Sequence, residues 1–334
     1  MAPMVVTGSS RRIGVVLGAL GMILAACSAG TPATAPASAG GGASLAPSAA
    51  AGDPATDKLA QILDRGTLVG YHETDYAPLS FQVVGAVRPT DSKCLPNQTT
   101  AAEVDGYDNA TTKLVAAGLG VEACFVSPTW TEITGGNWGD RLDIAYGSGS
   151  INADRMTRLY MTQPYYAVDN YFYVRADSAY QSAPELSGKT IGSCASCSHE
   201  YYLKGTLEIP GVEIVNEVTD PQIVTYETEP SGLQDVSDGM IEAFLCAKVT
   251  GDQAIKDGAP LRALERPAFT YYPSGFVDKS SGLAPAAFLD RVNGIIRGLQ
   301  GDGTLVAASV RYLGADYATG ASTFDLGAIG QVVP

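Results

Sequence analysis

The sequence predicts an α/β fold in which mainly parallel sheets carry helices on their faces. From Asp57 onward, short apolar runs typical of buried strands alternate with amphipathic runs typical of helices. This alternation is the pattern of βαβ units, whose strands lie parallel in one sheet. Residues 56–334 are long enough to form two lobes of ordinary domain size.

Helices are expected where apolar residues recur at helical spacing. A short one covers residues 58–64 and ends near Gly66, a second begins after Asp108 and closes at Gly120, and a strongly periodic one covers residues 285–299. Strands are expected at residues 67–71, 121–126, 143–146, 171–175, 190–192 and 243–245.

The N-terminus resembles an export signal. Arg11 and Arg12 precede an apolar run over residues 13–26, which is shorter than the 20 or so residues that a membrane-spanning helix needs. The run ends in Leu-Ala-Ala followed by Cys27, which resembles the bacterial lipobox. We therefore expect a signal peptide over residues 1–26 and a lipid on Cys27, with the chain anchored to the outer face of the cell membrane. The alternative is an ordinary signal peptide in which Cys27 occurs by chance.

The next segment has a biased composition. Residues 27–55 are almost all Ala, Gly, Ser, Pro and Thr and show no apolar periodicity. Such a segment has too little apolar surface to fold, so we expect a disordered tether. The chain carries a formal net charge of −14, and its Lys and Arg residues do not cluster after the signal. This distribution argues against binding to nucleic acid or to an anionic lipid surface.

Five cysteines remain when Cys27 is set aside, and an exported chain is expected to pair them as disulfides. Because five is odd, at least one thiol is free or pairs outside the chain. The Cys194-x-x-Cys197 spacing favours a disulfide over a zinc site, because the chain has only two His and no second Cys pair at ligand spacing. Pairing of Cys246 with one of these two cysteines is the open alternative.

Six motifs follow one another along the chain, at residues 66–70, 76–81, 105–108, 143–155, 163–166 and 186–192. The block from Asp143 to Arg155 is the most characteristic of them. Together the motifs resemble the bacterial extracellular solute-binding proteins of family 3, which serve importers of polar amino acids. The order and spacing hold over residues 59–314.

The resemblance implies a two-lobed periplasmic-binding-protein type 2 fold, each lobe a mixed, mainly parallel sheet flanked by helices, that closes on its ligand by a hinge motion. Lobe 1 is expected to comprise residues 56–167 and 274–334, and lobe 2 residues 168–273, with hinge crossings near 168 and 269–273. The implied function is that of a monomeric binding lipoprotein of an ABC importer. It would deliver a small carboxylate-bearing solute, an amino acid or a close relative, to the permease, without a cofactor or metal.

Two other functions are compatible with the same fold. One is a ligand-sensing or interaction lipoprotein that does not transport. The other is a dehydratase-like enzyme, which needs a poised acid or base in the cleft. Only Glu73 is a candidate for that role in the sequence, and neither His falls at a matched ligand position, so we expect no enzymatic activity.

The resemblance also assigns ligand-binding residues in lobe 1. The planar guanidinium of Arg155 can hold a carboxylate through two hydrogen bonds, with the hydroxyl and N–H groups of Ser148 and Ser150 beside it. Tyr76 and Trp130 match positions where the family places aromatic rings against the ligand. Trp130 is expected in a polar loop over residues 127–131, directly after a strand. The competing interpretations are a solvated helix start at Arg155 and ordinary core packing for the two aromatics.

Two further groups complete the predicted site. Glu73 is placed to accept a hydrogen bond from an ammonium group, or else is a surface carboxylate. In lobe 2, Ser196 and Ser198 offer hydroxyl and N–H groups at the start of a helix near His199.

Lobe 2 departs from the family pattern in two places. The family's amino acid binders commonly have Asp just after the strand at 243–245 to hold the ligand's ammonium, whereas this chain has Ala247 there. The loop at residues 193–198 contains two cysteines where relatives have Gly and Thr. In lobe 1, Cys94 lies in a long loop and Cys124 on a strand, and we expect these two to form a disulfide.

Overall fold

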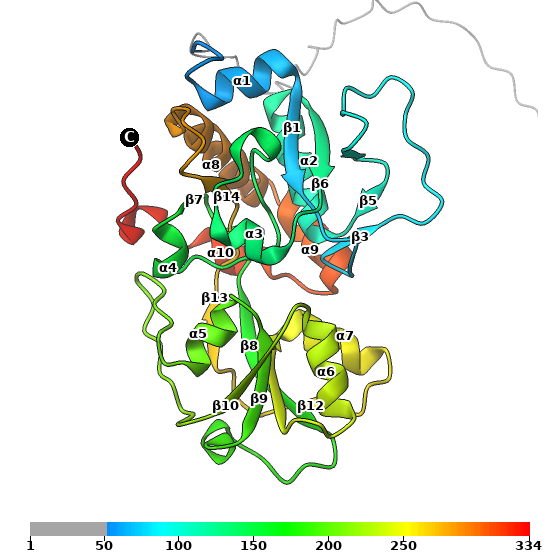
Figure 1. Ribbon diagram of the computed structural model, residues 1–334, viewed down its shortest axis with the longest axis vertical. Coiled ribbons are helices and arrows are strands. Elements are labelled where there is room, and N and C mark those ends of the chain that lie inside the picture. The colour runs from blue at the N-terminus through cyan, green and yellow to red at the C-terminus, as the bar shows by residue number, and fades with distance from the viewer. Residues whose placement is uncertain (1–51) are drawn as a thin grey trace, which may run out of the picture. The chain divides into compact units, whose positions relative to one another are not determined.

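The computed structural model describes residues 52–334 (Figure 1). The predicted signal peptide, Cys27 and most of the predicted tether lie outside the described residues. Within residues 52–334, none of the helices has the length and apolar character needed to cross a membrane.

Lobe 1 is built around three small sheets. In the first, β1 lies parallel to β6 with Thr67 opposite Glu122, and β4 lies antiparallel to β6. The other two sheets are antiparallel. Their strands are β1 (Thr67–Tyr71), β6 (Glu122–Val126) and β4 (Thr99–Thr100); β2 (Asp75–Tyr76), β3 (Ser80–Gln82) and β5 (Val104–Asp105); and β7 (Leu159–Met161) and β14 (Phe276–Asp278).

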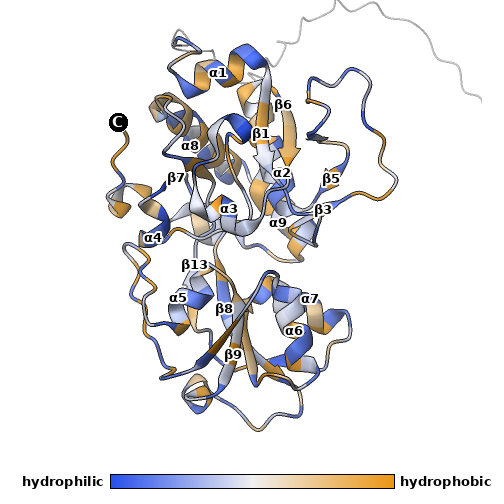
Figure 2. Cartoon of the chain, viewed as in Figure 1, coloured by the Kyte–Doolittle hydropathy of each residue, from blue (hydrophilic) through white to orange (hydrophobic). Residues whose placement is uncertain are grey.

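Helices cover these sheets. The N-terminal helix α1 begins at Asp57, whose carboxylate accepts the Ala60 N–H, and it ends at Gly66 in the left-handed conformation. Figure 2 shows apolar residues along β1 and β6, whereas α1 carries both apolar and hydrophilic residues. The helices of this lobe are α1 (Lys58–Arg65), α2 (Tyr107–Leu119), α3 (Trp130–Gly135), η1 (Gly139–Arg141), α4 (Ala153–Met156), α8 (Ala286–Gly301), α9 (Thr304–Leu313), α10 (Ala318–Ser322) and η3 (Leu326–Ile329).

Lobe 2 contains one mixed sheet of six strands. The order is β10-β9-β11-β8-β12, with β13 also paired to β8. The strands β9, β10 and β11 are parallel, and β8 is antiparallel to its neighbours. The elements are β8 (Val168–Arg175), β9 (Thr190–Cys194), β10 (Gln222–Tyr226), β11 (Ala243–Ala247), β12 (Leu261–Ala263), β13 (Phe269–Tyr271), η2 (Ala183–Leu186), α5 (Ser198–Leu203), α6 (Glu229–Ser237) and α7 (Lys248–Lys256).

The parallel strands decide which residues reach the space between the lobes. Helices α5, α6 and α7 follow β9, β10 and β11 directly along the chain. Because these strands are parallel, the three helix starts lie at the same edge of the sheet, the usual place of a ligand site in an open α/β sheet. The lobes are joined by β8 and β13, which pair with Val168 opposite Tyr271 (Figure 1).

Three local predictions need correction. Residues 143–146 are buried but form only single bridges, Gly70 with Ile144 and Ala145 with Phe276, and the N–H groups of Asp143 and Ile144 both donate to the same Val69 carbonyl rather than continuing a ladder. Asp108 does not precede its helix but lies in the first turn of α2, which Gly106 caps. Trp130 is not in a loop but begins α3, because Thr129 and Glu132 form a capping box there.

Asp143 is the centre of a buried ion cluster in lobe 1. Its carboxylate pairs with Lys58 Nζ at 2.6 Å and with the Arg65 guanidinium, and it accepts the Val69 N–H at 2.8 Å. The side chains of Lys58 and Asp143 are 3% and 1% exposed. The cluster therefore ties α1 and β1 to the segment that leads into the predicted site.

Cys94 and Cys124 form a disulfide that joins the long loop to β6. Replacing both cysteines with alanine is expected to lower the free energy of unfolding by about 3–4 kcal/mol, because the unfolded chain is released from a cross-link between residues 30 apart. Urea unfolding measures the change. Removing the Cys194–Cys197 disulfide, with a separation of 3 residues, is the matched control and should cost less. Equal losses would contradict the loop-length argument.

Candidate ligand-binding site

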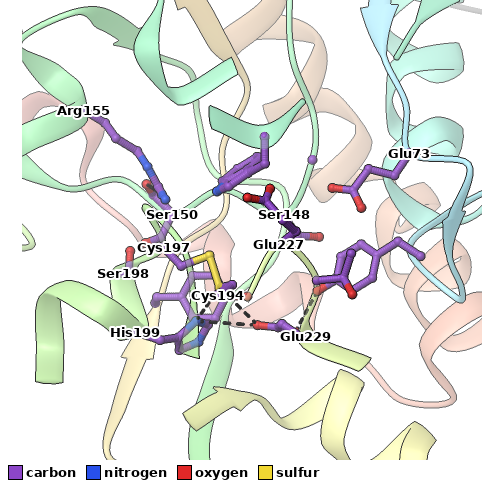
Figure 3. A pocket seen from close by; sticks show the side chains of 15 residues that line it. Glu73, Ser148, Ser150, Arg155, Cys194, Cys197, Ser198, His199, Glu227 and Glu229 are labelled. Carbon is purple, nitrogen blue, oxygen red and sulfur yellow. Dashed lines mark hydrogen bonds and ion pairs between the residues drawn. A yellow bond between two sulfur atoms is a disulfide. The ribbon is translucent and has the colours of Figure 1, made fainter. Parts of the chain in front are cut away.

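A pocket between the lobes gathers seven of the eight predicted ligand-binding residues (Figure 3). Ser196 is the exception, since it does not line the pocket. The seven are Glu73, Tyr76, Trp130, Ser148, Ser150, Arg155 and Ser198. The sequence did not assign the other lining residues, which are Gly147, Cys194, Cys197, His199, Glu227, Thr228, Glu229 and Tyr271.

Arg155 is fixed at one side of the pocket. It lies in α4, where the Asn152 side chain caps the helix by accepting the Arg155 N–H at 2.8 Å. Its guanidinium donates to the carbonyl oxygens of Ser150 at 2.8 Å and Ser196 at 2.9 Å, and so contacts both lobes. The guanidinium carbon lies 5.2 Å from the centre of the Trp130 ring. Arg155 is thus held rigidly, with its cation against an aromatic face.

The Arg155 cation has no anionic partner within the described part of the chain, where no carboxylate oxygen lies within 4.0 Å of it. The residue is 1% exposed, and burial lowers its pKa to about 10. Its Nε is buried without a hydrogen-bond partner, and so is Nε1 of Trp130. An unpaired buried cation costs several kcal/mol. The site is therefore complementary to an anion that accepts hydrogen bonds.

The serines beside Arg155 are already engaged. The Ser148 hydroxyl donates to Asp108 Oδ2 at 2.8 Å. The Ser150 hydroxyl donates to the Ile151 carbonyl at 3.1 Å and accepts the Tyr272 N–H at 3.2 Å. Ser196 contributes its carbonyl oxygen to Arg155 rather than a free hydroxyl. These residues therefore position the guanidinium and the pocket wall.

Carboxylates occupy the other side of the pocket. Glu229, at the start of α6, accepts a hydrogen bond from the Tyr76 hydroxyl at 2.8 Å, which links lobe 2 to lobe 1. Glu73 accepts the Tyr71 hydroxyl at 2.8 Å. Burial is the main cause that raises the pKa of both groups, to about 7 for Glu229. Figure 3 shows Glu73 and Glu229 on the side of the pocket away from Arg155.

Glu229 corrects two expectations. Glu73 is not the only acidic residue in the pocket, and a buried carboxylate does stand near the end of β11 although Ala247 itself is apolar. Glu229 follows β10, which is separated from β11 by β9, so it does not lie in register with β11 in the sequence. The signal was present in Thr228-Glu229-Pro230, a helix start directly after a strand that ends at the same sheet edge.

His199 also lines the pocket, although neither histidine falls at a ligand position matched to the family. It is 4% exposed, and burial lowers its pKa to about 3, so the ring is neutral. Nε2 lies 2.7 Å from Asn170 Oδ1. Nδ1 lies 3.4 Å from Cys194 Sγ and 3.5 Å from Glu229 Oε1.

The two cysteines of the pocket are paired with each other. The Cys194–Cys197 disulfide forms part of the wall, and within residues 52–334 the buried Cys246 has no disulfide partner. His199 is close enough to complete a metal-ligating group with these cysteines. A metal ion is bound by cysteine thiolates, however, and the two cysteines have no thiolate while they are joined as a disulfide.

The pH dependence of stability should reveal the buried Glu229. A carboxyl group whose pKa is raised from 4.5 to about 7 in the folded state stabilises the fold fully below about pH 4.5, and this contribution is lost as pH rises through about 7. In the wild type, Glu229 should lower the free energy of unfolding by about 3 kcal/mol between about pH 5 and pH 8. In Glu229→Gln this contribution to the pH dependence should be absent. Urea unfolding of the ligand-free protein at both pH values measures this. An unchanged fall would contradict the assignment.

Residues 90–315 match the model of a family described as the bacterial extracellular solute-binding proteins, family 3. The match spans more than half of the chain, and the chain belongs to this family. The two-lobed fold expected from the sequence motifs is confirmed by the solved structures it resembles.

Known proteins of this kind are similar over most of the chain. The L-cystine-binding protein TcyJ of Escherichia coli (strain K12) is 25% identical over 260 residues, which cover 77% of this chain and 86% of TcyJ. A mutant of ArgBP from T. maritima has a TM-score of 0.61 at 17% identity, covering 77% of this chain and 99% of that chain. The ancestral amino acid-binding protein AncCDT-1, a precursor of cyclohexadienyl dehydratase, has a TM-score of 0.60 at 20% identity with the same coverage.

Proposed function

We propose that this chain is the solute-binding lipoprotein of an ABC importer and that it binds an amino acid between its lobes. The observation that carries the proposal is the buried Arg155 guanidinium, which lines the pocket without an anionic partner in the described residues. A ligand carboxylate supplies the missing charge and accepts from the unpartnered Nε.

The opposite side of the pocket favours a ligand that is also cationic. Glu229 is buried and Glu73 is half-buried on that side, and the pKa values of both are raised because desolvation disfavours their charge. An ammonium group placed between them would stabilise the ionised forms. A cation binder on one side and an anion binder on the other fit the two ends of a zwitterionic α-amino acid.

The relatives support the same class of ligand. TcyJ is a binding protein for L-cystine, and AncCDT-1 is an amino acid-binding protein. We propose that residues 56–167 and 274–334 form lobe 1 and residues 168–273 form lobe 2, and that the monomeric chain hands its solute to a permease. We further propose that Cys27 carries the lipid that anchors the chain outside the cell.

Calorimetry on the soluble chain without residues 1–27 tests the function. We expect saturable binding of at least one α-amino acid, and weaker binding of its decarboxylated and deaminated analogues, because each lacks one of the two charges. Incubation followed by NMR of the ligand should show no conversion. Equal affinity for the amino acid and the decarboxylated amine would overturn the role given to Arg155, and conversion of the ligand would favour an enzyme.

A further inference from the structure

The Cys194–Cys197 disulfide is placed where a bound ligand can reach it. Both sulfur-bearing residues line the pocket, and Figure 3 shows the sulfur–sulfur bond between the Arg155 side and the Glu229 side. Cys194 is buried at 6% exposure, whereas Cys197 is less buried. A nucleophile in the pocket therefore approaches Cys197 more easily, and Cys194 is the sulfur that leaves.

The group next to Cys194 is an oriented histidine. The Asn170 amide donates to the carbonyl oxygens of Val168 at 3.3 Å and Phe269 at 3.2 Å, which fixes Oδ1 as the acceptor that faces His199. Nε2 of His199 therefore carries the proton of the neutral ring, and Nδ1 directs a lone pair toward Cys194 Sγ at 3.4 Å. A cysteine, a histidine and an asparagine in this order form the arrangement that activates a thiol for nucleophilic chemistry.

Glu229 adds a proton to this arrangement. Its Oε1 lies 3.5 Å from Nδ1 and 3.8 Å from Cys194 Sγ. An unprotonated Nδ1 and an ionised carboxylate would repel each other at this distance, so the pair holds one proton between them. The raised pKa of Glu229 agrees with that proton residing on the carboxyl group near neutral pH. A proton is thus available beside the sulfur that leaves.

We propose that the pocket captures thiol-bearing amino acids covalently, by exchange with the Cys194–Cys197 disulfide. The ligand thiolate attacks Cys197 Sγ, a new sulfur–sulfur bond joins the ligand to Cys197, and the bond to Cys194 breaks. Cys194 leaves as a thiolate and takes the proton shared by His199 and Glu229, while the proton lost by the ligand thiol restores that pair. No external oxidant is consumed, and the step reverses when Cys194 attacks the mixed disulfide.

The position of Arg155 selects the ligand class, and this part of the inference rests on the proposed function. Its guanidinium is bonded to the carbonyl oxygen of Ser196, the residue directly before Cys197. A carboxylate bound to Arg155 is therefore held beside the sulfur that is attacked. A thiol that carries a carboxylate should react faster than an equally nucleophilic thiol without one.

The experiment compares L-cysteine with cysteamine, which has the thiol and the amine but lacks the carboxylate. The oxidised protein without residues 1–27 is mixed with each thiol, and the adduct on Cys197 is followed by intact mass and peptide mapping. We expect L-cysteine to react at least about tenfold faster than cysteamine, because cysteamine cannot form the charge-assisted hydrogen bond to Arg155. The preference should disappear in Arg155→Met and persist in Arg158→Met, whose arginine is exposed and pairs with Asp154.

Two further measurements separate the inference from its alternatives. His199→Gln should slow the reaction of L-cysteine about a hundredfold, because proton transfer to the leaving sulfur is lost. The double variant Cys194→Ala/Cys197→Ala should still bind a thiol-free amino acid by calorimetry. Absence of an adduct on Cys197 with both thiols would overturn covalent capture, and equal rates for the two thiols would overturn the selection by Arg155, even where that binding persists. Absence of amino acid binding in the wild type would instead overturn the proposed function.

Discussion

Arg155→Met is expected to lower ligand affinity by about thirtyfold or more and to leave the stability of the ligand-free protein nearly unchanged. The affinity falls because the ligand carboxylate loses a buried, two-pronged charged partner, a change worth about 2–5 kcal/mol. Stability should change little, because methionine removes a buried charge that has no counter-ion in the described structure, and this gain offsets the loss of the hydrogen bonds to the Ser150 and Ser196 carbonyls. Calorimetry and urea unfolding measure the two effects.

Arg158→Met is the matched control for this experiment. Arg158 lies three residues further on, its side chain is 40% exposed, and it forms an exposed ion pair with Asp154. Its replacement should leave affinity unchanged and alter stability by less than about 1 kcal/mol. Equal loss of affinity in both variants would mean that general electrostatic attraction, rather than a specific contact at Arg155, binds the ligand.

Asp143→Asn is expected to lower the free energy of unfolding by about 3–5 kcal/mol. The carboxylate is buried between Lys58 and Arg65, and its loss leaves the Lys58 ammonium buried without an anion. The amide keeps the shape of the side chain, so the loss reports on charge rather than on a cavity. Urea unfolding at neutral pH measures the change in the free energy of unfolding.

The exposed pair of Arg175 and Asp177 provides the comparison for Asp143. Their side chains are 45% and 69% exposed, so water already screens both charges. Asp177→Asn should therefore change stability by less than about 1 kcal/mol. A similarly small effect of Asp143→Asn would show that water or a neighbouring group compensates Lys58 in solution.

Much of the fold followed from local sequence patterns. The helix at Lys58–Arg65, the strand at Thr67–Tyr71 and the strand at Glu122–Val126 lie where periodicity and glycine signals predicted them. The motif spacing also predicted which residues of lobe 1 meet in the pocket, because these loops follow strands in a known order. The ligand role of these residues stays a prediction.

The residues that were missed depend on sheet order, which a local pattern does not contain. Glu229 reaches the pocket because β10 is parallel to β9 and ends at the same edge. His199 reaches it because α5 begins directly after β9, at the same edge of the sheet, and Asn170 on β8 orients its ring. Glu229 and Tyr76 are 153 residues apart in the sequence, so their spacing gives no indication of the hydrogen bond that joins them.

That hydrogen bond sets a thermodynamic condition on ligand choice. An ammonium group of the proposed ligand would compete with the Tyr76 hydroxyl for the Glu229 carboxyl group, and the hydrogen bond from Tyr76 already joins the two lobes. A ligand shifts an equilibrium between open and closed forms only by the difference in its affinity for the two. A solute that only replaces Tyr76 at Glu229 exchanges one hydrogen bond for another and does not favour the closed form. A solute that leaves the Tyr76–Glu229 bond intact and binds the other oxygen of the Glu229 carboxylate adds a contact in the closed form and therefore favours closure.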